Sequence, residues 1–244
     1  MSRSREVRLS VWLGCVSPVL LALGSKPLPA QEPAGVGGSI ALTSDYEVRG
    51  ISRSDEHPAA QIDLHYANGA MLAGLFASSV QIDPSQHRDV ELSPYIGYVA
   101  SGTHWQTRAL VASYRYPWNA AGHAYDYDEL EIEETFHDWL DLRLTWSPDW
   151  PAPDGHGVDA ESLTVTLQHR LASHWSGDAG GGYFELDRGD PRGYAFWGLG
   201  MRYEFEPQPL SITLSVIGTT GAARALFYNA ASRGNAAVTL LWRF

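Results

Sequence analysis

The sequence predicts an all-β protein, an antiparallel transmembrane β-barrel of about 12 strands with short periplasmic turns and long extracellular loops. Three observations predict this fold. Apolar and polar residues alternate with period two through many segments. No segment beyond the N-terminus approaches about 18 consecutive apolar residues. Composition agrees, because the chain has 18% charged residues, 11% aromatic residues and 24 glycines, a mixture typical of strands and turns.

The N-terminus has the pattern of an export signal. Three arginines within the first eight residues precede an apolar stretch over residues 9–23, and Ala30 offers a small residue for cleavage. The apolar stretch is short for a membrane helix, and Pro18 interrupts it. We therefore expect a signal peptide over residues 1–30, a short segment over 31–37, and one barrel domain over 38–244.

Cysteine content and charge narrow the function classes. The only cysteine, Cys15, lies in the expected signal peptide, so the exported chain offers no thiol ligand for a metal. Removal of residues 1–30 moves the net charge from -11 to -14 and leaves arginine as the only strongly basic residue. Nucleic-acid binding requires a positive surface, so we expect no nucleic-acid partner.

The alternation assigns a lipid-facing side to each expected strand. In the first strand, residues 39–49, it places Ile40, Leu42, Tyr46 and Val48 outward. The same pattern recurs over 60–66, 127–136, 140–146, 163–168, 197–205, 210–216 and 236–244, and further strands are expected near 70–80, 89–100, 105–116 and 175–185. His169 falls on the lipid-facing side of its strand.

The connections alternate strictly in length. Short turns are expected around 67–69, 101–103, 137–139, 172–174 and 206–209, and long polar connections over 50–59, 81–88, 117–126, 147–160, 186–193 and 218–235. This alternation is typical of outer-membrane barrels. Inside hydrocarbon, a closed barrel is the only sheet that pairs every backbone N–H and C=O group. The alternative is a soluble periplasmic β-barrel or sandwich, whose apolar face would form a packed core.

The last nine residues, AAVTLLWRF, are expected to close the barrel. Val238, Leu240, Trp242 and Phe244 share the lipid-facing side of this strand. A terminal phenylalanine on an alternating strand resembles the signal by which the barrel-assembly machinery recognises its substrates. The expected partners are therefore this machinery, outer-membrane lipid and lipopolysaccharide, and small hydrophilic solutes.

Several motifs carry a resemblance to a known family. Residues 38–54 read GSIALTSDYEVRGISRS, and the pair Pro58-Ala59 follows. Further along, residues 114–117 read YRYP and residues 126–130 read DYDEL. These motifs resemble those of the TorF-type porin family of Gram-negative bacteria, although Val48 replaces the usual aromatic residue. The resemblance implies an outer-membrane barrel and implies no particular solute.

Polar residues of the opposite parity are expected to line the pore. The set comprises Asp45, Glu47, Arg49, Asp63, His65, Glu91, Glu129, Glu131, Glu133, Asp141, Arg143, Arg202, Glu204 and Arg243. In one interpretation, these carboxylates attract cations into a water-filled pore. In the other, carboxylates and arginines pair across a narrow lumen and fill it.

Two local clusters allow a second interpretation. Glu129, Glu131 and Glu133 share one strand face, which suits either a divalent cation or a wall neutralised by arginines; we expect the wall and no metal. Tyr116, Trp118, Tyr125 and Tyr127 flank one long loop. We expect an outer aromatic girdle there, the alternative being a sugar-stacking surface.

The sequence therefore predicts an outer-membrane porin-like channel for passive diffusion of small hydrophilic solutes, with weak cation preference. The alternative is a closed-lumen barrel that acts as a structural or adhesive surface protein through its loops. We expect no enzyme activity, because no nucleophile has a base at meaningful spacing, and no cofactor. The long 219–234 loop is the candidate constriction.

Overall fold

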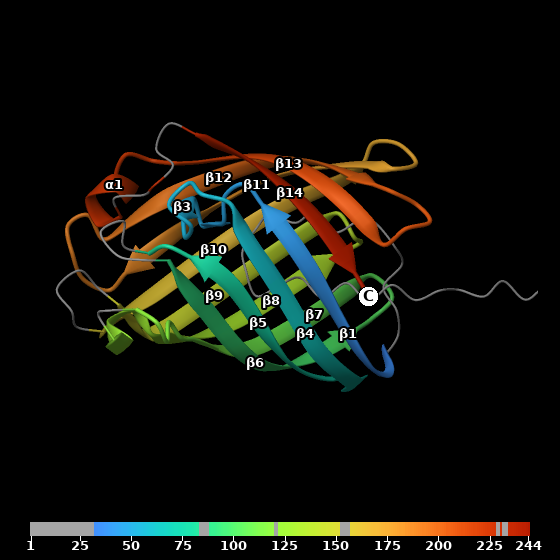
Figure 1. Ribbon diagram of the computed structural model, residues 1–244, viewed down its shortest axis with the longest axis horizontal. Helices are drawn as coiled ribbons and strands as arrows, with labels where there is room; N and C mark the ends of the chain where they lie inside the picture. Colours follow the sequence, from blue (N-terminus) through green and yellow to red (C-terminus); the bar gives the residue numbers. More distant parts are fainter. Residues whose placement is uncertain (1–31, 83–87, 120–121, 152–156, 228–229, 231–233) are drawn as a thin grey trace, which may run out of the picture.

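The computed structural model describes residues 32–82, 88–119, 122–151, 157–227, 230 and 234–244. Twelve strands close into an antiparallel barrel in the ring order β1-β14-β13-β12-β11-β10-β9-β8-β7-β6-β5-β4 (Figure 1). Each strand pairs with its neighbours in sequence, and the pairing of β1 with β14 closes the ring. The expected fold class is confirmed. The expected signal peptide lies outside the described residues.

The barrel strands are long enough to cross a membrane. They are β1 (Glu32–Thr43), β4 (Ala59–Gly69), β5 (Met71–Val80), β6 (Asp89–Ser101), β7 (Trp105–Tyr114), β8 (Tyr127–Phe136), β9 (Leu140–Pro151), β10 (Gly157–Arg170), β11 (Trp175–Leu186), β12 (Gly193–Glu204), β13 (Leu210–Thr219) and β14 (Asn235–Arg243). Four short elements are not part of the ring of strands: the hairpin strands β2 (Glu47–Val48) and β3 (Ile51–Ser52), the 3₁₀ turn η1 (Gly122–Tyr125) and the one-turn helix α1 (Ala223–Leu226). Among the residues described, no helix is both long and apolar enough to span a membrane.

The outer wall is apolar because the predicted alternation holds through the strands. Ile132 is 43% exposed and Leu214 is 55% exposed, whereas the residues that alternate with them are buried inside the ring. An exposed belt of this extent needs hydrocarbon around it. His169 also lies on the exposed side, as predicted.

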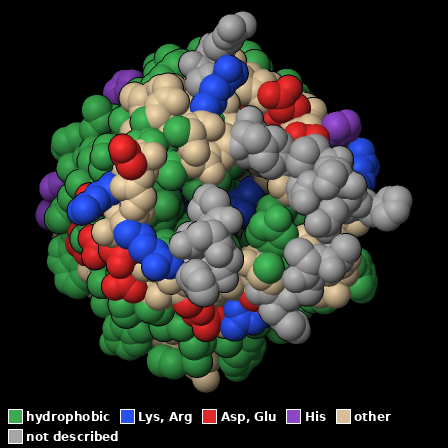
Figure 2. Space-filling view, turned by 90° about the vertical axis from the view of Figure 1, so that its left-hand side faces the viewer, with side chains coloured by type: hydrophobic (Ala, Val, Ile, Leu, Met, Phe, Trp, Pro, Cys, Tyr) green, Lys and Arg blue, Asp and Glu red, His purple; other side chains and the backbone are tan. Residues whose placement is uncertain are grey.

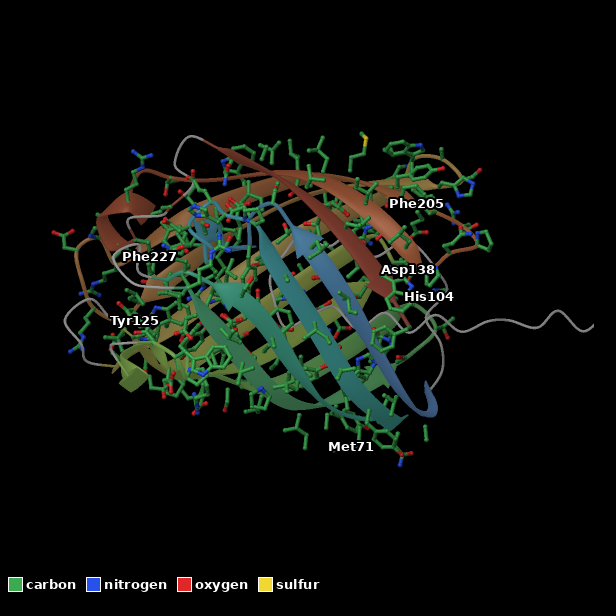
Figure 3. All side chains as sticks on the ribbon, viewed as in Figure 1. Met71, His104, Tyr125, Asp138, Phe205 and Phe227 are labelled. Atoms are coloured by element: carbon green, nitrogen blue, oxygen red, sulfur yellow. The ribbon has the colours of Figure 1, made fainter. Side chains whose placement is uncertain are left out.

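The two ends of the barrel differ, as the loop lengths predict. Figure 1 shows the long connections and α1 at its left end, and the C-terminus beside the short turns at the right. Figure 3 places Tyr125 and Phe227 at the long-loop end, and His104, Asp138 and Phe205 at the short-turn end. One expected long loop is wrong: β9 and β10 extend through most of 147–160, because their ladder continues to Pro151 and Gly157.

The expected first strand, residues 39–49, is also wrong in its second half. β1 ends at Thr43, and the chain then turns into the barrel. Tyr46 and Val48, which the alternation places against lipid, are buried inside. Upstream, β1 begins at Glu32, before the position where the sequence pattern places the start of the barrel.

Candidate functional site in the barrel lumen

Residues 44–58, called here the inner segment, cross the lumen from one wall to the other. The segment leaves β1, and its Arg49 reaches β8 and β9. β9 is six strands from β1 in either direction around the ring, so it forms the opposite wall. Arg49 Nη2 lies 2.7 Å from Glu129 Oε2 and 2.9 Å from Thr145 Oγ1. The inner segment therefore narrows the lumen by spanning it.

Asp45 holds the base of the inner segment. Its Oδ1 accepts hydrogen bonds from Ser52 Oγ at 2.6 Å and Ser54 Oγ at 2.8 Å, and its Oδ2 accepts one from Asn235 Nδ2 at 2.6 Å. These bonds fold the segment back on itself and tie it to the closing strand β14.

Gly50 permits the tight tip of the β2–β3 hairpin. Its φ is +77°, a conformation that glycine adopts at little cost. A Cβ at this position would lie 2.3 Å from Thr219 Cγ2, so the tip fits closely against the wall. Ile51 pairs with Ala230 in an isolated bridge, which joins the hairpin to the 220–234 connection.

Tyrosines and arginines fix the middle of the segment at the long-loop end. Glu91 accepts hydrogen bonds from Tyr46 Oη at 2.9 Å and from Tyr116 Oη at 2.7 Å. Arg53 donates to Tyr127 Oη at 3.2 Å, and its guanidinium lies 5.6 Å from the ring centre of Trp150. This half of the lumen is thus lined by aromatic rings that contact the inner segment.

A charged network fills part of the short-turn half. Arg108 Nη2 lies 3.0 Å from Glu131 Oε1 and also pairs with Glu133. Arg143 Nη2 lies 3.0 Å from Glu133 Oε2, and Asp141 accepts a hydrogen bond from Thr135. The glutamates of β8 form the arginine-countered wall that the sequence predicts. Among the described residues, no group of three or more His, Cys, Asp or Glu side chains is arranged to hold a metal ion.

A second network joins β4 to β6. His65 Nδ1 lies 2.7 Å from Asp63 Oδ1, and Tyr95 Oη donates to Asp63 Oδ2 at 2.8 Å. All three side chains are buried. Asp63 therefore has both oxygens engaged within the wall.

Two buried carboxylates differ from the rest because they lack hydrogen-bond partners. Glu47 is 2% exposed and Asp178 is 6% exposed, and neither oxygen of either group has a partner. Burial raises the pKa of Glu47 to about 8, and the negative charge of the neighbouring Asp45 adds to the rise.

The structure places all 14 expected pore-lining residues inside the barrel or at its short-turn end. Eleven are buried. Arg143, Glu204 and Arg243 are partly exposed. Asp45, Glu47 and Arg49 are inside for a different reason than predicted, because they belong to the inner segment and not to a wall strand.

Several important residues escaped the sequence analysis or were misplaced by it. Tyr116 is 1% exposed and Tyr127 is also buried, so the expected outer girdle at this loop is wrong for both. Trp118 is exposed. Arg108 and Asp178 point into the barrel from strands in which the alternation of apolar and polar residues is weak. A regular alternation along these strands would have been the sequence signal for them.

The 219–234 loop is the expected constriction. Its Phe227 packs against the buried side chains Phe184 and Tyr194, and its ring centre lies 6.2 Å and 5.9 Å from theirs. Tyr228 of this loop lies outside the described residues. Figure 2 views the long-loop end, where acidic and basic side chains gather on the rim above the apolar outer wall.

A closed twelve-stranded barrel with an apolar belt and a polar, charged interior defines an outer-membrane β-barrel of porin-like architecture. Its place is the outer membrane. The chain belongs to a family of bacterial proteins of unknown function, Gcw_chp, whose model matches residues 29–242. This match does not confirm the TorF-type resemblance.

Solved structures share the fold. The COG4313 outer membrane channel from Pseudomonas putida F1 superposes with a TM-score of 0.52 at 10% identity, covering 91% of this chain and 98% of that one. The NanC porin superposes with a TM-score of 0.51 at 8% identity, covering 85% of this chain and 98% of that one. Among curated proteins, none matches the sequence significantly.

Proposed function

We propose that this protein is a narrow outer-membrane channel for passive diffusion of small hydrophilic solutes, with a weak preference for cations. The observation that carries the proposal is the charge of the interior. Among the described residues, nine buried carboxylates besides Glu47 face three buried arginines, with Arg53 and Arg143 partly exposed beside them. Fixed negative charge raises the local concentration of cations in a confined lumen.

The unpartnered carboxylates favour a channel over a closed-lumen barrel. In a lumen filled only by protein, Glu47 and Asp178 would each bury oxygens without donors, which is costly. Water or passing cations would supply the missing partners. The closed-lumen alternative is favoured by the tight burial of the inner segment, and conductance separates the two.

The inner segment would set the size limit of this channel. It spans the lumen between β1 and β9 and is held by Asp45 at its base and Arg49 at its tip. We therefore expect low conductance, because solutes must pass beside this segment.

Single-channel recording in a planar bilayer under a KCl gradient tests the proposal. Discrete steps with a cation-selective reversal potential are expected, and Glu131→Gln should weaken the selectivity. A folded barrel that stays electrically silent would favour the closed-lumen alternative, in which the long loops carry the function.

The remaining partners follow from the same proposal. Residues 1–30 would direct export, β14 would engage the barrel-assembly machinery, and the outer wall would contact lipid and lipopolysaccharide. The TorF-type resemblance supports the porin assignment and names no solute. We propose no enzymatic role; a phospholipid hydrolysis assay tests that part separately.

A further inference from the structure

One wall of the lumen is built almost without side chains. The inward positions in the middle of β11 and β12 are four glycines: Gly180, Gly182, Gly198 and Gly200. Gly180 and Gly198 are directly paired. A Cβ on Gly200 would lie 2.3 Å from Asp178 Oδ1, so the Asp178 carboxylate lies flat along this wall. The Phe196 ring lies over Gly182 in the same way, so these glycines leave room for the side chains of their neighbours.

Unpartnered acceptor oxygens meet at the short-turn end of the glycine wall. Asp178 pairs across the strands with Gln168 of β10. Both side chains are buried, and three oxygens have no hydrogen-bond partner: Asp178 Oδ1, Asp178 Oδ2 and Gln168 Oε1. These atoms lack donors, and burying acceptors in this state costs free energy unless a ligand or water supplies them.

Arg202 is the charged neighbour of the Asp178 oxygens. It lies two positions beyond Gly200 on the same face of β12, and its Nε donates to Thr213 Oγ1 at 3.3 Å. Its positive charge partly balances Asp178, while both Asp178 oxygens still lack a hydrogen-bond donor. A bare Ca²⁺ ion would need six to eight oxygen ligands, whereas an ammonium group brings three N–H donors.

We propose that Asp178 and Gln168, at the end of the glycine wall, form a subsite for the primary ammonium group of a small solute. This inference rests on the proposed channel function and names a class of solute for it. The ammonium group would donate to the acceptor oxygens of Asp178 and Gln168.

The test compares methylammonium with tetramethylammonium, which carries the same charge and has no N–H donor. The full-length protein is purified in detergent, and its thermal unfolding midpoint is measured in each chloride salt at equal ionic strength. Methylammonium should raise the midpoint by a few degrees more than tetramethylammonium does. Asp178→Asn should abolish that difference.

Two further variants keep the test decisive. Gly200→Ala forces the Asp178 carboxylate aside without removing its charge and should also abolish the difference. Glu161→Gln removes one carboxylate from the exposed outer wall of β10 and should retain it. If Asp178→Asn does not fold, the midpoint difference of Gly200→Ala tests the subsite in its place. Equal midpoints in the wild type, or a difference that survives these lumen variants, would overturn the subsite.

Bilayer recording separates this inference from the channel proposal. Conducting channels with no thermal preference for methylammonium would sink the subsite and leave the channel. A silent barrel whose methylammonium stabilisation depends on Asp178 would sink the channel and leave the binding site.

Discussion

At the residue scale, Arg49 is the contact that holds the tip of the inner segment to the far wall. Its guanidinium bonds Glu129 and Thr145 and lies 5.6 Å from the ring centre of Phe184. Removing one member of a buried ion pair leaves the other charge unpaired, at about 3–5 kcal/mol. The informative variant therefore removes both charges.

The double variant Arg49→Met/Glu129→Gln should release the tip and increase single-channel conductance, because the segment would no longer span the lumen. Arg188→Met, at the exposed long-loop end, is the matched control and should leave conductance unchanged. Conductance equal to wild type in the double variant would show that the inner segment does not limit flow.

Tyr46 forms a second contact between the inner segment and the barrel wall, through its hydrogen bond to Glu91. Tyr46→Phe removes the hydrogen bond to Glu91, which keeps its bond from Tyr116. A hydrogen bond to a charged group contributes about 2 kcal/mol, so the free energy of unfolding should fall by about that amount. Urea unfolding in lipid vesicles, followed by tryptophan fluorescence, measures it. Tyr66→Phe, on the exposed face of β4, should change it little.

At the element scale, each strand has one lipid face whose tolerance of charge depends on depth. Leu214 lies in the middle of β13, and Leu210 begins that strand at the short-turn end. Leu214→Arg should lower the free energy of unfolding by about 2–4 kcal/mol, and Leu210→Arg by about 0–1 kcal/mol. Equilibrium unfolding in vesicles tests the contrast; equal losses would contradict a membrane midplane near Leu214.

At the scale of the whole molecule, β14 closes the ring by pairing with β1, and Phe244 adds the last contact of that pair. Phe244 exchanges backbone hydrogen bonds with Gly38 at 3.0 Å, and its ring lies over that glycine. Ring closure removes the last free sheet edge. Phe244 thus extends the β1–β14 pairing by one residue pair.

Deletion of Phe244 should lower the amount of protein in the outer membrane, because it removes the hydrogen bonds to Gly38 at the end of the β1–β14 pair and the residue that we propose as the assembly signal. Membrane fractionation with heat-shift electrophoresis measures it. Refolding of the same variant in detergent, where no assembly machinery is present, measures the effect on barrel closure alone. Normal outer-membrane levels of the variant would contradict the assembly role.

The sequence alone determined the ring and its faces. Alternation is a local property, set by the two-residue period of a strand and by the demand that lipid-facing side chains be apolar. Ile132, Leu214 and Leu240 could therefore be assigned to the outer wall, and Glu131 to the interior, without coordinates. The count of strands and the two unlike ends followed from the same local signals.

Only the tertiary structure decided what occupies the lumen. Tyr46 and Val48 continue the alternation of β1, so local pattern assigns them to lipid; the bonds of Asp45 to Ser52, Ser54 and Asn235 turn the chain inward instead. Arg49 finds Glu129 and Thr145 only because ring closure sets β1 opposite β9. Partners so distant in sequence leave no periodic trace, which is why the path through the barrel required the fold.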